Sequence, residues 1–247
     1  ERDRRQIMST RLDGRRWDQL REVTIERGTA IYAEGSALIK SGNTQILCTA
    51  TVSKGVPIFL RDSGQGWITA EYAMLPRATG MRTKRERRGA GGRTMEIQRL
   101  VGRSLRSVVD LTQLGDRTIT VDCDVLLADG GTRTAAITGA FVALSDSINN
   151  LVADGQIARN PIKEHVAAIS VGILKGKAAL DLCYEEDSSA EVDMNIVMTG
   201  SGKFVEIQGT AEREPFSWEK MNDLMRLAET GIGKLLETQR AVLAQSQ

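Results

Sequence analysis

The feature that most constrains the fold is a strand-like segment that passes through two glycines directly into a helical segment. Alternating apolar residues predict a strand over residues 117–127, and Gly130 and Gly131 follow almost at once. Glycine adopts positive φ readily and lets the backbone come close to a ligand. Thr132 is placed to cap a helix over residues 132–152, whose first turn leaves backbone N–H groups free for an anion.

Arg133 lies in the first turn of that helix, where the positive end of the helix dipole disfavours a cation. An anion held between the arginine and the end of the helix would remove this cost. The turn therefore predicts an anion site, and the alternative is an ordinary strand-to-helix turn with an arginine on the surface.

The composition is typical of a soluble protein. The 247 residues suit one large domain or two small ones, and the formal net charge is only +1. The N-terminus lacks the apolar run of a secretion signal, and nowhere do about 18 uninterrupted apolar residues occur. The three cysteines stand far apart in apolar runs, which favours buried, reduced thiols. We expect a cytoplasmic protein with no membrane partner.

The single histidine, His165, excludes several kinds of active site. Ser-His-Asp and Cys-His nucleophile systems need a histidine in a defined partnership, and many metal centres need more than one. His165 follows Pro161 in a polar segment, where a solvated loop position is expected. An enzyme built on this chain therefore uses carboxylates, arginines and a hard metal ion.

The most unusual composition lies between residues 77 and 93, where seven cations face the single acid Glu86. Seven minus one gives +6, in a chain whose total is +1. Four glycines make this segment a flexible loop suited to the phosphate backbone of a nucleic acid, and a solvated loop without a partner is the alternative. Arg99, on the helix predicted to follow, extends this surface or belongs to a salt-bridged exterior. The candidate nucleic-acid contacts are Arg77, Arg82, Lys84, Arg85, Arg87, Arg88 and Arg99.

The order of the elements, strands and helices followed by the same again, predicts an α+β fold with two similar lobes of hairpins packed with helices. Residues 1–22 carry seven arginines and five acids and predict an irregular N-terminal arm. The predicted domains are residues 16–152 and 163–244, joined by a linker with Gly155 and Pro161. The predicted strands cover residues 23–27, 36–40, 44–52, 67–75, 117–127, 166–174, 177–184, 192–198 and 204–208, and the predicted helices residues 94–112, 132–152 and 217–244.

Two aspartates in the second half are candidates for a metal site. Asp193 stands inside an apolar run, where a charge without a function is unusual. Asp187 ends one predicted strand as Asp193 begins the next, so the two carboxylates can converge on one point. Such a pair suits Mg²⁺ that keeps most of its waters and binds through a substrate phosphate, while a solvated acidic turn is the alternative. The anion site, the basic loop and the metal pair together suit phosphoryl transfer on a nucleic acid.

Seven segments, spread in order over nearly the whole chain, carry a resemblance to a known family. They are GQGWITAEY (64–72), GGRTMEIQRL (91–100), DCDV (122–125), DGGTRT (129–134), YEED (184–187), AEVDMN (190–195) and VEIQGTAE (205–212). With these segments the chain strongly resembles the ribonuclease PH family of phosphate-dependent 3′-to-5′ exoribonucleases. A match of this length in the family's own order makes the resemblance specific.

The resemblance implies a fold, a reaction and an assembly. It implies an α+β fold with two lobes, and a homohexameric ring, a trimer of dimers, whose basic loops face the RNA. The implied reaction uses inorganic phosphate to trim the 3′ ends of tRNA precursors and other RNA, releases nucleoside 5′-diphosphates and is reversible. The implied site residues are Arg93, Gly131, Thr132 and Arg133 for phosphate, and Asp187 and Asp193 for catalysis and for Mg²⁺ or Mn²⁺.

Two other functions compete with this one. A catalytically silent ring subunit would only bind RNA, and the intact pair Asp187 and Asp193 argues against it. A metal-dependent nuclease would use water as the nucleophile, and this class generally needs a richer carboxylate cluster than the acidic turn provides.

Overall fold

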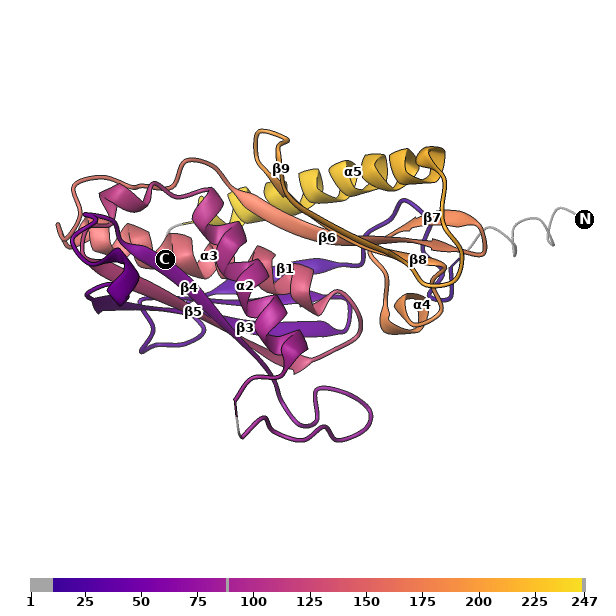
Figure 1. Cartoon of the computed structure of the whole chain (residues 1–247), viewed down its shortest axis with the longest axis horizontal. Helices are drawn as coiled ribbons and strands as arrows, with labels where there is room; N and C mark the ends of the chain where they lie inside the picture. Colours follow the sequence, from indigo (N-terminus) through magenta and orange to yellow (C-terminus); the bar gives the residue numbers. More distant parts are fainter. Residues whose placement is uncertain (1–10, 88, 246–247) are drawn as a thin grey trace, which may run out of the picture.

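The computed structural model of the chain describes residues 11–87 and 89–245. These residues form two β-sheets with α-helices packed on them, which confirms the predicted α+β class (Figure 1). The loop between β4 (Trp67–Met74) and α2 (Gly92–Ser107) extends away from the body of the molecule, at the bottom of Figure 1.

The first sheet is mixed, with one parallel pair of strands. Neighbouring strands are antiparallel except β4 and β5, which run parallel. A parallel pair needs a crossover connection, and α2 lies in the connection between these two strands. The order of the sheet is β1 (Val23–Arg27), β2 (Gly35–Ser41), β3 (Thr44–Lys54), β5 (Arg117–Leu127) and β4.

The second sheet is antiparallel and is covered by α5 (Trp218–Leu243). Ser217 caps this helix by accepting a hydrogen bond from the backbone N–H of Lys220, close to the predicted start. The apolar stripe of the helix packs on the sheet through Leu224, Ala228, Ile232, Leu235 and Leu236. The order of the sheet is β7 (Lys177–Leu180), β6 (Val166–Leu174), β8 (Val192–Thr199) and β9 (Phe204–Ala211).

Helix α3 (Thr132–Ala153) is the central element, because it packs against β2 and β3 of the first sheet and β6 of the second. A Cβ atom at Gly139 would lie 2.7 Å from the side chain of Ile39, so the helix approaches the sheet closely there. By length and composition α3 could cross a membrane, but 83% of its most apolar window is buried inside the protein. The helix is therefore placed as a core helix, and its N-terminus begins at the predicted anion turn.

Several predicted element boundaries are wrong: α2 ends at Ser107 instead of residue 112, β9 extends to Ala211 instead of residue 208, and two further boundaries also differ. Strand β7 ends at Leu180 instead of residue 184, because Asp181 adopts a φ of 58° that no strand can continue through. The residues expected to end that strand form the short helix α4 (Tyr184–Asp187) instead. Helix α2 begins at Gly92, two residues before the predicted start, with Gly91 as its N-cap, and the Thr94 hydroxyl donates to Glu86 at 3.0 Å.

The predicted irregular arm is also firmly anchored where it is described. Residues 11–22 form no helix or strand, yet Arg11, Arg15 and Arg21 are only 5 to 8% exposed. Arginine is almost never buried unless it is paired, and these three side chains pair with acids of the second half of the chain. Residues 1–10 lie outside the described part of the chain.

Candidate active site

The predicted anion turn forms between β5 and α3, with φ angles of 74° at Gly130 and 64° at Gly131. Gly131 is the N-cap of α3, and Thr132 is its first residue, so the prediction that Thr132 caps the helix is wrong. The Thr132 hydroxyl instead accepts a hydrogen bond from the buried hydroxyl of Tyr72 at 2.9 Å. No side chain caps this helix, so the N–H groups of its first turn remain available to a ligand.

Gly130 also joins the two halves of the chain. A Cβ atom at this position would lie 2.5 Å from the carbonyl oxygen of Leu182 and 2.8 Å from the backbone nitrogen of Tyr184. Only glycine fits there, because every other residue would push the turn and the start of α4 apart. The anion turn therefore lies directly against the segment that carries Asp187.

A cavity of about 330 Å³ brings four of the predicted site residues together. Arg93 comes from α2, Arg133 from α3, Asp187 from α4 and Asp193 from β8. Gly131 and Thr132 do not line this cavity and lie two residues and one residue before Arg133, respectively. We call this space the charged cavity; its lining residues are Arg93, Arg133, Asp187, Asp193, Asn195, Gln208, Gly209, Thr210 and Glu212.

Several polar residues of this lining were not predicted from the sequence as site residues. Asn195 lies on β8, Gln208 and Thr210 lie on β9, and Glu212 follows β9. The antiparallel register sets Asp193 opposite Thr210 and Asn195 opposite Gln208. Every second residue of a strand points to the same face, so the alternation Glu206, Gln208, Thr210 was the available signal.

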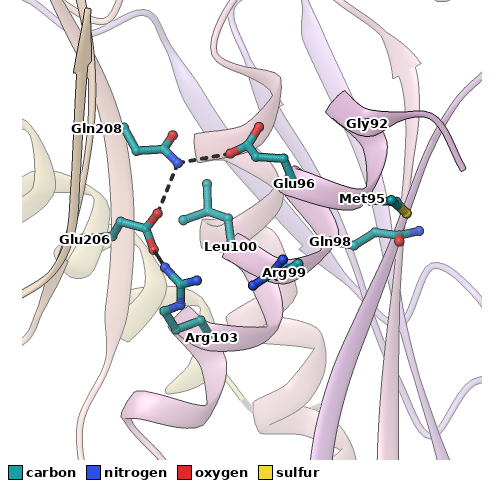
Figure 2. Close-up of a pocket in the computed structure, with 9 residues that line it drawn as sticks. All are labelled: Gly92, Met95, Glu96, Gln98, Arg99, Leu100, Arg103, Glu206 and Gln208. Atoms are coloured by element: carbon teal, nitrogen blue, oxygen red, sulfur yellow. Dashed lines mark hydrogen bonds and ion pairs between the residues drawn. The ribbon is translucent and has the colours of Figure 1, made fainter.

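Gln208 fixes one side of the Arg133 guanidinium. Arg133 Nη1 donates to Gln208 Oε1 at 2.9 Å and to Glu96 Oε1 at 3.3 Å. The amide nitrogen of Gln208 donates in turn to Glu96 and to Glu206, each at 3.0 Å, and Glu206 pairs with Arg103 (Figure 2). Arg133 is thus held from one side by α2 and β9.

The two aspartates of the charged cavity carry an electrostatic cost. Burial, together with the neighbouring carboxylate of Asp187, raises the pKa of Asp193 to about 6. Burial also raises the pKa of Asp187, although Arg93 and Arg133 act in the opposite direction. Asp193 Oδ1 is buried and has no hydrogen-bond partner among the described residues. A buried carboxylate oxygen without a partner is costly unless a cation or a donor from a ligand meets it.

Similarity to known proteins shows the family to which the chain belongs. The model of the 3′ exoribonuclease family, domain 1, matches residues 19–148, and that of domain 2 matches residues 165–231. The chain is 60% identical over 235 residues to ribonuclease PH of Bacillus pumilus, covering 94% of this chain and 97% of that one. This chain belongs to the 3′ exoribonuclease family.

Two solved structures share the fold. An Archaeoglobus fulgidus exosome with RNA bound to the active site has a TM-score of 0.80 at 24% identity, over 94% of this chain and 93% of that one. An archaeal exosome core has a TM-score of 0.77 at 23% identity, over 96% and 94% of the two chains.

Membership of this family gives the chain a phosphorolytic 3′-to-5′ exoribonuclease activity of the kind that processes tRNA, with inorganic phosphate as a substrate. The charged cavity has the composition that such a reaction needs, because arginines can hold phosphate groups beside two acids. Its lining contains no histidine.

The basic loop of this exoribonuclease lies next to the charged cavity. The cations of its described residues are exposed, and none of them forms an ion pair. A second cavity, of about 510 Å³, separates the loop from β4 and shares Arg93 with the charged cavity. Its basic lining residues from the loop are Lys84, Arg85 and Arg87.

Three of the predicted RNA contacts line neither the charged cavity nor the cavity beside the basic loop. Arg77 and Arg82 are exposed on the loop but line neither cavity. Arg99 lines a groove of about 530 Å³ between α2 and β9, which touches the charged cavity only through Gln208 (Figure 2). Arg88 lies outside the described residues.

Proposed function

We propose that the charged cavity is the place where inorganic phosphate attacks the last phosphodiester of an RNA 3′ end, and that tRNA precursors are among the substrates. The observation that carries this proposal is the convergence of Arg93 and Arg133 with Asp187 and Asp193 in one cavity. Phosphoryl transfer depends mainly on positioning and on neutralising charge, which these groups supply.

The phosphate is held on the arginine side of the cavity. Arg93 and Arg133 donate to its oxygens, and the free N–H groups at the start of α3, at Gly131 and Thr132, complete the site. A phosphate oxygen attacks the terminal phosphorus, and the bond from phosphorus to the 3′ oxygen breaks. The products are a nucleoside 5′-diphosphate and an RNA that is shorter by one nucleotide. The reaction is reversible, since one phosphate bond replaces another.

The acid side suits a divalent cation. Asp187 and Asp193 would hold Mg²⁺ or Mn²⁺, for which carboxylate oxygens and substrate phosphate are the preferred ligands. The unpartnered Oδ1 of Asp193 and its raised pKa support this role. No group of three or more His, Cys, Asp or Glu residues in the described part of the chain is arranged as a metal site, so the substrate would supply further ligands. When bound, the ion would neutralise charge on the scissile phosphate and the leaving oxygen.

A ring of copies would let the basic loops act together on one RNA. We include in the proposal a homohexamer, a trimer of dimers, because a single loop offers few contacts and several copies raise the effective concentration. The fold likeness to exosome core subunits supports a ring. The free cysteines of the described residues support a reducing, cytoplasmic location. Light scattering that detected an active monomer would exclude the ring.

The decisive experiment replaces Arg133 by lysine and measures cleavage against phosphate concentration. Lysine keeps the charge but lacks the planar fork of donors that can bind a phosphate and Gln208 together. We expect the phosphate concentration for half-maximal rate to rise about 10- to 100-fold, with RNA affinity little changed.

The control is Arg27→Lys, because Arg27 pairs with Asp146 outside the charged cavity. Products identified by mass should be nucleoside 5′-diphosphates. Monophosphate products in phosphate-free buffer would favour the hydrolytic alternative, and wild-type protein that binds RNA without cleaving it would favour the silent ring subunit.

A further inference from the structure

The described N-terminal segment places three buried arginines against the acidic segment that carries Asp187. We call Arg11, Arg15 and Arg21 the arginine strap. Their side chains are 0%, 9% and 6% exposed, and the carboxylates of Asp181 and Glu186, which they contact, are each 2% exposed. Such buried charges need defined partners, so the strap fixes the geometry of the segment it contacts.

Two members of the strap hold the acid next to Asp187. Arg11 Nε donates to Glu186 Oε1 at 2.7 Å, and Arg15 Nη2 lies 3.5 Å from Glu186 Oε2. Both arginines also donate to the backbone carbonyl of Asp181, at 2.9 and 3.0 Å. Glu186 is therefore bound on the inner side of α4, while its neighbour Asp187 lines the charged cavity.

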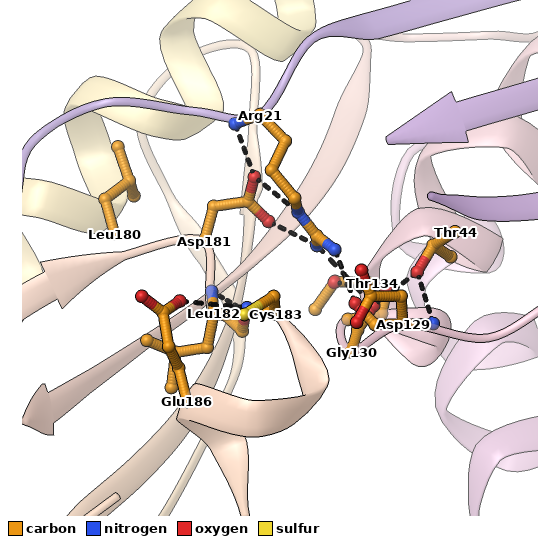
Figure 3. Close-up of polar contacts among 12 residues, drawn as sticks. Arg21, Thr44, Asp129, Gly130, Thr134, Leu180, Asp181, Leu182, Cys183 and Glu186 are labelled. Carbon is orange, nitrogen blue, oxygen red and sulfur yellow. Dashed lines mark hydrogen bonds and ion pairs between the residues drawn. The ribbon is translucent and has the colours of Figure 1, made fainter. Parts of the chain in front are cut away.

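Arg21 reaches both halves of the site at once. Its Nε and Nη2 donate to the two oxygens of Asp181, at 3.1 and 2.6 Å, and its backbone N–H donates to the same carboxylate at 2.8 Å. Its Nη1 donates to the carbonyl oxygen of Asp129, at 2.6 Å, in the anion turn (Figure 3). A Cβ atom at Gly131 would lie 3.0 Å from Arg21 Nη2, so the guanidinium also packs on that glycine.

A second connection runs beside Arg21. Asp129 Oδ1 accepts the backbone N–H of Tyr184, the first residue of α4, at 3.1 Å. Gly130 packs against the same backbone. The anion turn and the acid segment are thus joined by one guanidinium, one carboxylate and one close glycine contact, and none of the three lines the charged cavity.

We propose that Arg21 is a positioning residue, which together with the Asp129–Tyr184 contact sets the spacing between the phosphate side of the charged cavity at Gly131–Arg133 and the acid side at Asp187. This rests on the roles proposed above for those residues. In-line attack requires the two sides to be held in register, and a displacement of about 1 Å can cost on the order of a hundredfold in rate. Each side keeps its own groups when Arg21 is changed, so binding survives while turnover falls.

The test is Arg21→Lys, which keeps the charge but cannot contact Asp181 and Asp129 with one planar group. We expect kcat to fall about 10- to 100-fold, while the half-saturating phosphate concentration and the RNA affinity change less than about threefold. A raised phosphate requirement with normal kcat would make Arg21 part of the phosphate site and overturn the proposal.

The matched control is Arg27→Lys. Arg27 forms another bidentate pair, with Asp146, and its side chain is 13% exposed. Asp146 is 14 residues along α3 from Thr132, or about 21 Å along the helix axis. We expect a comparable loss of thermal stability in both variants but an unchanged kcat in the control. Equal kcat for the two, per folded molecule, would show that the Arg21 pair is structural only.

A second variant covers the case in which Arg21→Lys does not fold. Asp129→Ala removes the acceptor for Tyr184 and leaves the pair of Arg21 with Asp181 intact. It should lower kcat about 3- to 10-fold at an unchanged phosphate requirement; an unchanged kcat would overturn the proposal. If Arg133→Lys leaves the phosphate dependence normal, the proposed site fails. If Arg133→Lys is impaired while Arg21→Lys and Asp129→Ala both turn over normally, only the positioning role proposed for Arg21 fails.

Discussion

Two arginine-rich stretches of this chain have opposite surroundings. Arg11, Arg15 and Arg21 of the strap are buried and bound to carboxylates. The cations of the basic loop, such as Arg85 and Arg87, are exposed and form no ion pair among the described residues. Both stretches lack regular secondary structure, so the difference comes from what the rest of the chain brings to each.

The difference lies in the supply of acids. Asp181 and Glu186 lie far from the strap in sequence, and the fold delivers them to it. The loop has only Glu86, whose carboxylate accepts a hydrogen bond from Thr94. A buried, paired arginine stabilises structure and fixes geometry, while an exposed and unpaired one stays available to a polyanion. An arginine-rich sequence therefore does not reveal its role until its carboxylate partners are known.

The strongest test of this contrast concerns Asp193, which is half-buried and forms no ion pair with an arginine of the described residues. Asp193 differs from Asp181 and Glu186 in that its Oδ1 lacks any partner in the described residues. Burying a carboxylate oxygen without a partner costs stability. If the protein keeps this cost because catalysis needs the carboxylate, Asp193→Asn should lower kcat by about a thousandfold or more while RNA binding stays nearly intact. Rapid-quench turnover and filter binding would measure this, and normal turnover at ordinary Mg²⁺ concentration would remove Asp193 from the mechanism.

The contrast itself is tested by the same substitution in both stretches. Arg11→Gln leaves the buried carboxylate of Glu186 poorly compensated and should cost about 3 kcal/mol in the free energy of unfolding. Arg85→Gln changes an exposed side chain and should cost less than about 0.5 kcal/mol. Urea titration of both variants would provide the comparison. Equal losses would mean that burial and pairing do not separate the two stretches.

A pH titration sharpens the comparison between paired and unpaired acids. The pKa of Asp193 rises from 3.8 to about 6 on folding, so the folded state binds more protons than the unfolded state between these values. Stability from this group is therefore present at low pH and is lost as pH rises through about 6. In metal-free buffer, Asp193→Asn should be more stable than wild type at pH 7.5, by up to about 3 kcal/mol, and the gap should close near pH 4. A gap that stayed constant over this range would contradict the raised pKa.

The smallest effect per residue is expected in the basic loop. Removing one cation that binds a phosphate should flatten the dependence of log RNA affinity on log salt by about 0.7 to 1 unit, for all RNA sequences alike. The variant replaces by glutamine Arg82, Lys84, Arg85 and Arg87, while a control of equal charge change replaces the exposed α5 residues Lys220, Arg226, Lys234 and Arg240. An unchanged slope in the loop variant would show that the loop is merely solvated.

Local patterns were enough to predict most of the strands and helices. The alternation in residues 117–127 predicted β5 with its bounds, and α5 begins one residue after the predicted start at residue 217. The strands predicted over residues 36–40 and 44–52 pair as a hairpin, in which Ser41 faces Thr44. These features depend on residues close together in sequence, which is why the sequence alone could predict them.

Features that depend on distant partners could not be predicted in this way. The early end of β7 depends on Asp181 meeting Arg21, and the anchoring of the strap depends on Glu186. Arg93, Arg133, Asp187 and Asp193 were chosen from motifs and do line one cavity, but their contacts with β9 needed the strand register. His165, expected in solvent, packs instead against the ring of Phe141, with centroids 4.8 Å apart, because α3 lies beneath that linker.

The separation in sequence between the strap and its acids also sets an order in time. Arg11 and Glu186 are 175 residues apart, and a ribosome adds about 5 to 20 residues per second. Roughly 9 to 35 seconds therefore pass between the synthesis of the arginine and that of its partner. Throughout that interval the first sheet can assemble around α3, while Arg11 lacks its carboxylate partner Glu186. The anion turn and the acid segment are joined only after the ribosome has passed Glu186, so the machinery for cutting RNA is completed later than the first sheet.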